Sequence, residues 1–120
     1  RDGEVWTDDS VEILLDANYD RKSYHHFAVN AKGVLYDGRG KDASWTGTAQ
    51  AKTAVEEDAW TGELVIPLDE IGADLGEFKT WGLQLTRHRT RWEERKSYQW
   101  APPFWYGNHV PSLFGQLEFP

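Results

Sequence analysis

The segment Val5-Trp6-Thr7-Asp8-Asp9-Ser10-Val11-Glu12-Ile13-Leu14-Leu15-Asp16 carries the clearest structural pattern in the chain. From Ser10 onward, the apolar residues Val11, Ile13 and Leu15 alternate with polar neighbours. An alternation with a period of two residues is typical of a β-strand that has one buried face and one polar face. We therefore expect an amphipathic strand here, preceded by a tryptophan that has no place in the alternation.

Further short strands follow this segment, separated by turns that are rich in Gly, Asn and Asp. The same pattern predicts strands over residues 24–30, 34–37, 52–55, 60–67, 81–89 and 115–119, and a short paired segment over 98–101. A helical turn is expected only over residues 68–72. Short strands at such spacing indicate an all-β fold. We predict one domain over residues 1–120, built as a two-sheet antiparallel β-sandwich of jelly-roll-like architecture.

The composition limits the classes of partner that this chain can have. Its 120 residues include 13 Lys and Arg against 20 Asp and Glu, so the net charge is -7. An acidic domain repels nucleic-acid phosphates and anionic lipid headgroups, so we expect no nucleic acid and no membrane as partner. Cys is absent, which excludes disulfides and thiolate metal sites and favours a bacterial over an animal secreted domain.

Five ordered stretches carry a further signal. They are Trp6-Thr7-Asp8-Asp9-Ser10-Val11-Glu12-Ile13, Phe27-Ala28-Val29-Asn30, Lys52-Thr53-Ala54-Val55, Trp81-Gly82-Leu83-Gln84-Leu85 and Pro111-Ser112-Leu113-Phe114-Gly115-Gln116-Leu117. Together they resemble the family 9 carbohydrate-binding modules and their relatives in the DOMON-like β-sandwich superfamily. The resemblance covers nearly the whole chain. It implies a non-catalytic module that binds a poly- or oligosaccharide, within a secreted, extracellular bacterial enzyme such as a glycoside hydrolase.

The resemblance also implies a sugar site on the concave face of the sandwich. Trp6 matches the first of two tryptophans that clamp the sugar, and Glu12 matches a polar contact on the following strand. The position of the second clamp aligns with Asn108, while Trp105 and Tyr106 lie nearby. Because a pyranose ring stacks its C–H face on an aromatic ring, we expect Trp105 or Tyr106 to be the second stacking platform.

The strand over residues 81–89 supplies polar candidates for the same surface. Residues of one parity are expected to share the face of Glu12, and these are Gln84, Thr86 and His88. Ala28 stands where sugar-binding family members carry an Arg, so we expect Arg89 or Arg87 to supply a guanidinium group instead. Parity directs Arg87 toward the core, however, and predicts a buried side chain that is paired with a carboxylate.

Two groups of residues are considered as metal ligands. Asp16, Asn18 and Asp20 place oxygen atoms at every second position, as calcium loops do, but an Asx-turn explains the same spacing. Apart from a structural calcium there, we expect no cofactor. The pair His25 and His26 is less suited to a shared metal because adjacent strand residues point to opposite faces.

Two alternatives to sugar binding stay open. Ala28 and Asn108 depart from the family pattern, so the chain could be a structural or interaction β-sandwich that has lost its sugar site. It could instead be a subunit of a glycoside hydrolase or lyase, although no carboxylate pair stands out and we do not expect an enzyme. Family members have further strands before the segment of Trp6. We therefore expect this chain to be the C-terminal part of a larger sandwich, completed by an N-terminal segment or a second chain.

Overall fold

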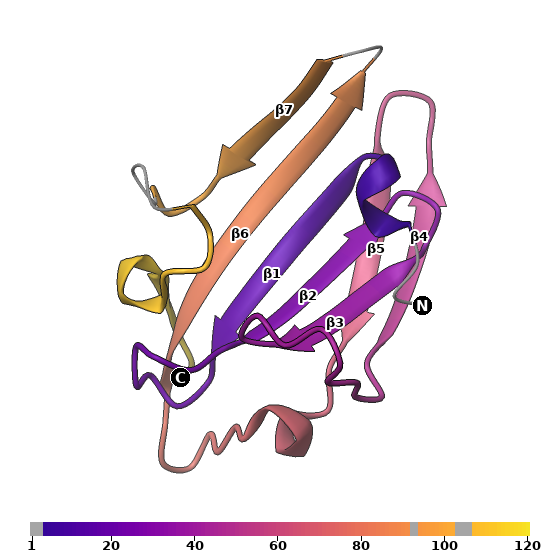
Figure 1. Ribbon diagram of the computed structural model, residues 1–120. Helices are drawn as coiled ribbons and strands as arrows, with labels where there is room; N and C mark the ends of the chain where they lie inside the picture. Colours follow the sequence, from indigo (N-terminus) through magenta and orange to yellow (C-terminus); the bar gives the residue numbers. More distant parts are fainter. Residues whose placement is uncertain (1–3, 92–93, 103–106) are drawn as a thin grey trace.

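The computed structural model describes residues 4–91, 94–102 and 107–120, and these residues form an all-β fold, as expected (Figure 1). The strands are β1 (Ser10–Asp16), β2 (His25–Asn30), β3 (Leu35–Arg39), β4 (Gln50–Val55), β5 (Trp60–Val65), β6 (Thr80–Arg91), β7 (Glu94–Gln99) and β8 (Gly115–Glu118). Short 3-10 helices form at η1 (Val5–Thr7), η2 (Leu68–Ile71) and η3 (Pro111–Leu113).

The opening amphipathic strand, β1, is the central strand of a six-stranded antiparallel sheet. The strand order is β3-β2-β1-β6-β7, and β8 pairs with β6 as well. β1 pairs with β2 and β6 over almost its whole length, so that Glu12 lies opposite Ala28 on one side and Thr86 on the other. Side chains from β1, β2 and β6 therefore meet on each face of the sheet.

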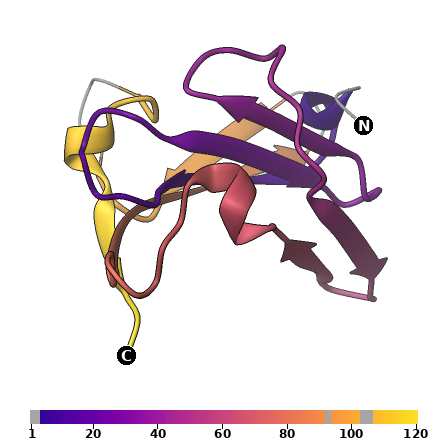
Figure 2. The same ribbon diagram turned by 90° about the horizontal axis from the view of Figure 1, so that it is seen from below.

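One face of the six-stranded sheet carries the main hydrophobic core. Leu15, Phe27 and Trp81, from three neighbouring strands, are buried there. β4 and β5 form a separate two-stranded sheet, which lies with η2 on one side of the six-stranded sheet (Figure 2). The β4–β5 sheet packs against this core through Leu64, and η2 contributes the buried Ile71. The alternation in the sequence thus places the apolar parity of β1 against a second layer of structure.

The opposite face of the sheet is also largely buried. Leu14, which interrupts the alternation of β1, is fully buried there with Tyr24 and Phe114. Apart from Ala28, the other side chains that β1, β2 and β6 bury on this face are polar. They are Ser10, Glu12, Asp16, His26, Asn30, Gln84, Thr86 and His88. β1 is therefore covered on both faces. This explains why Leu14 is apolar although the other residues on its face of the strand are polar.

The prediction of a buried, carboxylate-paired Arg87 is wrong, because its side chain is exposed. A groove of about 950 Å³ separates this part of the sheet from the β4–β5 hairpin, and Arg87 lines it with Arg89, Trp60 and Val11. Arg87 does lie on the core-facing side of the sheet, as its parity predicted, but the second layer leaves this end of the sheet uncovered. A long basic side chain can therefore reach solvent from the core-facing side.

β6 is longer than the sequence pattern suggested. It continues to Arg91, and the chain returns as β7 from Glu94. The residues that follow the predicted strand over 81–89 thus belong to a hairpin in which β6 pairs with β7. Within the described residues, no helix is both long enough and apolar enough to cross a membrane.

Candidate ligand-binding face around Glu12

The side chain of Glu12 is the centre of a buried polar cluster on the face opposite the main core. Its Oε1 atom lies 2.7 Å from His26 Nε2. Its Oε2 atom hydrogen-bonds His88 Nε2 and accepts a bond of 3.2 Å from Asn108 Nδ2. The antiparallel register produces this arrangement, because β2 and β6 flank β1 and place His26 and His88 on either side of the carboxylate.

The two imidazoles control the ionisation of Glu12. Burial alone would raise the pKa of this carboxyl group, but the hydrogen bonds and positive charge of His26 and His88 outweigh burial and lower its pKa to about 2. Glu12 is therefore ionised at neutral pH, and an ionised carboxylate only accepts hydrogen bonds. It follows that both Nε2 atoms carry the proton and donate it to Glu12.

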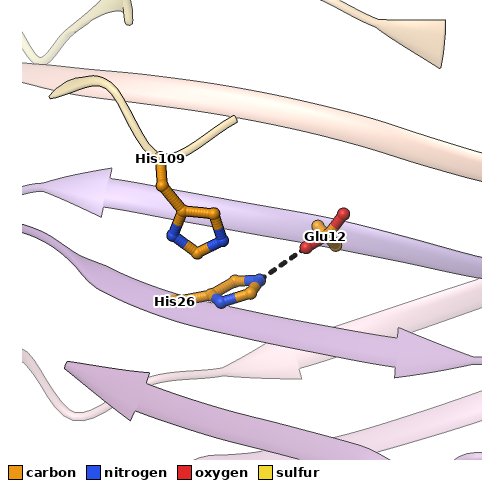
Figure 3. Close-up of side chains that lie close together, drawn as sticks. All are labelled: Glu12, His26 and His109. Atoms are coloured by element: carbon orange, nitrogen blue, oxygen red, sulfur yellow. Dashed lines mark hydrogen bonds and ion pairs between the residues drawn. The ribbon is translucent and has the colours of Figure 1, made fainter. Parts of the chain in front are cut away.

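His109 extends this cluster from the loop that precedes η3. Its ring centroid lies 4.9 Å from that of His26, and its Nδ1 atom lies 2.7 Å from the hydroxyl of Tyr24. Burial, together with the nearby charge of His26, lowers the pKa of His109 and so favours the neutral ring. One possible ligand atom from each of Glu12, His26 and His109 lies within 4.8 Å of the others (Figure 3).

Trp6 forms an aromatic border to the cluster. The 3-10 helix η1 holds its indole against β2, with ring centroids 6.0 Å from His26 and 5.7 Å from Tyr36. The indole also meets His88 edge to face, at 6.2 Å. Trp6 is only partly buried, so it presents aromatic surface beside an ionised, hydrogen-bonded polar centre.

Several oxygen atoms near Glu12 have spare hydrogen-bonding capacity. In the part of the chain that the structure describes, Ser10 Oγ, Thr86 Oγ1 and Asn108 Oδ1 are buried without a hydrogen-bond partner. Ser10 and Thr86 lie on the same face as Glu12, and Asn108 contacts its carboxylate. Because a buried polar atom without a partner is costly, these atoms are suited to a polar ligand or to water.

Gln84 has a structural role on the same face. Its Nε2 atom donates to Ala101 O at 2.5 Å, and its Oε1 atom accepts from Ala101 N at 3.0 Å. This pair of bonds fixes the chain after β7 to the centre of the sheet. The side chain is 1% exposed, so its amide is already used within the protein.

The structure brings together five of the residues that the sequence singled out for sugar binding. Trp6, Glu12, Gln84, Thr86 and His88 all lie on the face around Glu12. Arg89 does not, because it has the opposite parity and lines the groove beside the β4–β5 hairpin. The two candidates for the second stacking platform, Trp105 and Tyr106, lie outside the described residues.

His26 and His109 were not among the residues predicted for this site from the sequence. A useful signal was present for His26, because adjacent strand residues point to opposite faces, and its neighbour His25 indeed packs on the core-side Trp45, with ring centroids 4.8 Å apart. What the sequence could not supply was the register between β1 and β2, which brings His26 next to Glu12. Asn108 reaches Glu12, so the position that aligns with the second clamp lies at the site, with an amide instead of an indole.

The residues considered for calcium form a tight turn after β1. Asp16 accepts backbone N–H bonds from Arg21 at 2.7 Å and from Asp20 at 3.2 Å, and Asn18 Oδ1 also accepts from Asp20 N. Tyr19 and Arg21 have positive φ angles of 51° and 59°. The Asx-turn explanation therefore accounts for these oxygen atoms, while a structural calcium stays a prediction.

We expect the substitution Asp16→Ala to lower the free energy of unfolding by about 2 kcal/mol, since it removes the acceptors of two partly buried backbone hydrogen bonds. Urea unfolding measures this change. The exposed Asp58→Ala is the matched control and should change stability by less than about 0.5 kcal/mol. A loss in Asp16→Ala no larger than in the control would contradict a structural role, and a rise in melting temperature of the wild type with Ca²⁺ would support the calcium site.

Comparisons with known proteins give no further guide to this face: a scan against models of protein families, a search of curated proteins and a search of solved structures each found no match.

Proposed function

We propose that this chain is a non-catalytic carbohydrate-binding domain whose ligand site is the face around Glu12. In this proposal the β4–β5 sheet and the six-stranded sheet are the two layers of a β-sandwich. The domain would belong to a secreted bacterial enzyme that acts on polysaccharides, and it would raise the effective concentration of that enzyme at its substrate. One observation carries the proposal, namely the partly exposed indole of Trp6 beside the buried ionised carboxylate of Glu12.

The chemistry of this face suits a polyhydroxylated ring. An indole stacks on the apolar C–H face of a pyranose, while polar groups around it bind the hydroxyls. Asn108 Oδ1 and Thr86 Oγ1 have free capacity to accept hydrogen bonds. Glu12 already accepts three bonds, from His26, His88 and Asn108, which leaves about one of its lone-pair positions for a ligand. Glu12 would therefore act mainly by fixing the groups around it.

The charge state of Glu12 favours binding over hydrolysis. A glycosidase needs a carboxylic acid that protonates the leaving oxygen, and such a group has a raised pKa. The pKa of Glu12 is lowered instead, to about 2, so at neutral pH it has no proton to give. It is also a weak base. Glu12 is therefore unsuited to be the general acid of a glycosidase, and its oxygen atoms already accept three hydrogen bonds, which supports a binding role for this face.

We expect Trp6→Ala to weaken carbohydrate binding at least about tenfold, because the stacking surface is lost. Affinity gels or calorimetry with glucans, xylan and acidic polysaccharides would measure this. Trp60→Ala is the matched control, since Trp60 is also partly buried but lines the groove on the other side of the sheet. If none of these polysaccharides binds, or if only Trp60→Ala loses binding, the proposed site is wrong. The first outcome would support the alternative of a structural or interaction domain.

A further inference from the structure

Three potential metal ligands converge on one point of this face. Glu12 comes from β1, His26 from β2, and His109 from the loop before η3 (Figure 3). Their donor atoms lie within 4.8 Å of one another, and one pair, His26 Nε2 and Glu12 Oε1, is 2.7 Å apart. Ligands of a tetrahedral zinc ion with bonds of about 2.0–2.1 Å lie roughly 3.3 Å apart, which falls between these two values.

In His109 and Glu12, the polar atoms that do not face the common point are held by other groups. His109 Nδ1 bonds to the Tyr24 hydroxyl at 2.7 Å, which leaves its Nε2 atom for a ligand. Glu12 Oε2 bonds to His88 and Asn108, which leaves Oε1 on the side of His26. Metal ligands in proteins are typically oriented by such outer hydrogen bonds, which fix the tautomer of a histidine and the direction of a carboxylate.

We propose that Glu12 Oε1, His26 Nε2 and His109 Nε2 bind one divalent first-row transition ion of the zinc class. Two imidazoles and one carboxylate form a donor set that suits zinc, copper or nickel better than calcium or magnesium, which prefer oxygen alone. The ion replaces the proton that His26 donates to Glu12, so binding releases this proton to solvent. Three protein ligands leave a fourth position for a small oxygen ligand such as water.

Unpartnered polar atoms beside the three ligands support this inference independently of their spacing. In the described part of the chain, Asn108 Oδ1 and Thr86 Oγ1 are buried without a hydrogen-bond partner, and Asn108 contacts Glu12 directly. A water on the open coordination position would donate hydrogen bonds to such acceptors. The inference shares Glu12 with the proposed sugar site but does not depend on sugar binding.

The test is calorimetric titration of Zn²⁺ alone into protein that has been stripped of metals with a chelator. We expect one ion per chain, and a higher melting temperature in the presence of Zn²⁺. His109→Gln should weaken binding at least about tenfold, and Tyr24→Phe should weaken it less, because Tyr24 only positions His109. The matched control is His25→Gln, which removes the neighbouring histidine on the opposite face and should leave Zn²⁺ affinity unchanged.

The absorption spectrum of the Co²⁺-loaded protein provides a second measurement, because visible bands report direct coordination by nitrogen and oxygen ligands. His109 is only partly buried, so circular dichroism should show that His109→Gln remains folded. Absence of a one-to-one Zn²⁺ complex in the wild type, or equal affinity in wild type and folded His109→Gln, would overturn the metal site. Trp6→Ala should retain Zn²⁺ binding, so a failure of the sugar proposal would be distinguishable from a failure of this one.

Discussion

Glu12→Gln is expected to lower the free energy of unfolding by about 3 kcal/mol and to reduce ligand binding at the face around it. The wild-type carboxylate accepts bonds from His26, His88 and Asn108 in a buried setting. A glutamine offers one oxygen and turns an amide donor toward groups that themselves donate. Removal of one partner from a buried charged cluster leaves the others without compensation, which typically costs several kcal/mol.

The pH dependence of this loss identifies its cause. The pKa of Glu12 is about 2 in the folded protein against an ordinary value of 4.5, so its ionised form stabilises the fold fully above pH 4.5. This contribution is lost as the pH falls from 4.5 toward 2, because the unfolded state then binds the proton more readily. The difference in stability between wild type and Glu12→Gln should therefore be largest above pH 4.5 and shrink toward pH 2.

Urea unfolding at pH 7 and at pH 3 measures both effects. Glu118→Gln is the matched control, because Glu118 is an exposed strand residue, and its substitution should change stability by less than about 0.5 kcal/mol. A Glu12→Gln protein as stable as the control at pH 7 would show that the cluster does not hold the carboxylate in its ionised form.

Phe27→Ala is expected to lower the free energy of unfolding by about 4 kcal/mol. Phe27 is fully buried at the centre of the main core, where its ring meets that of Trp45 edge to face at 6.3 Å. Truncation removes the apolar contacts of the ring and leaves a cavity between the sheet and its covering layer. Few single substitutions in a domain of this size should cost more.

Thermal or urea unfolding of Phe27→Ala, beside the exposed Val55→Ala, tests this expectation. Val55 is 72% exposed, so its truncation should have little effect. The core of Phe27 lies on the opposite face from Glu12, so the folded fraction of Phe27→Ala should keep the ligand affinity of the wild type. A loss below about 1 kcal/mol would contradict the assignment of the core to this face.

Much of the fold followed from the two-residue period of the strands. The alternation in the opening segment placed Ile13 and Leu15 on one face and Glu12 on the other, and the same parity put Thr86 and His88 beside Glu12. This worked because a strand has only two faces, so a local pattern fixes which side chains share a surface. The all-β class followed for the same reason.

The rest of the site depended on information that a local pattern does not contain. The register between β1 and β2 brings His26 next to Glu12. His109 comes from a distant loop, 83 residues after His26 and 97 residues after Glu12 in the sequence. Arg87 had the expected parity, but its exposure depended on how far the β4–β5 hairpin extends over the sheet. Pairing register and the extent of a covering layer are set by tertiary packing.

If ligands bind on the face around Glu12, the side chains of that face must respond to them. NMR titration of the isotope-labelled protein with an oligosaccharide of the glucan, xylan or acidic polysaccharide that binds best measures this response, through the indole signal of Trp6 and the side-chain amide of Asn108. We predict that these two signals shift together, while the indole signal of Trp60 in the opposite groove stays unchanged. Shifts confined to Trp60 and the backbone of Arg89, with Trp6 and Asn108 unmoved, would contradict the claim.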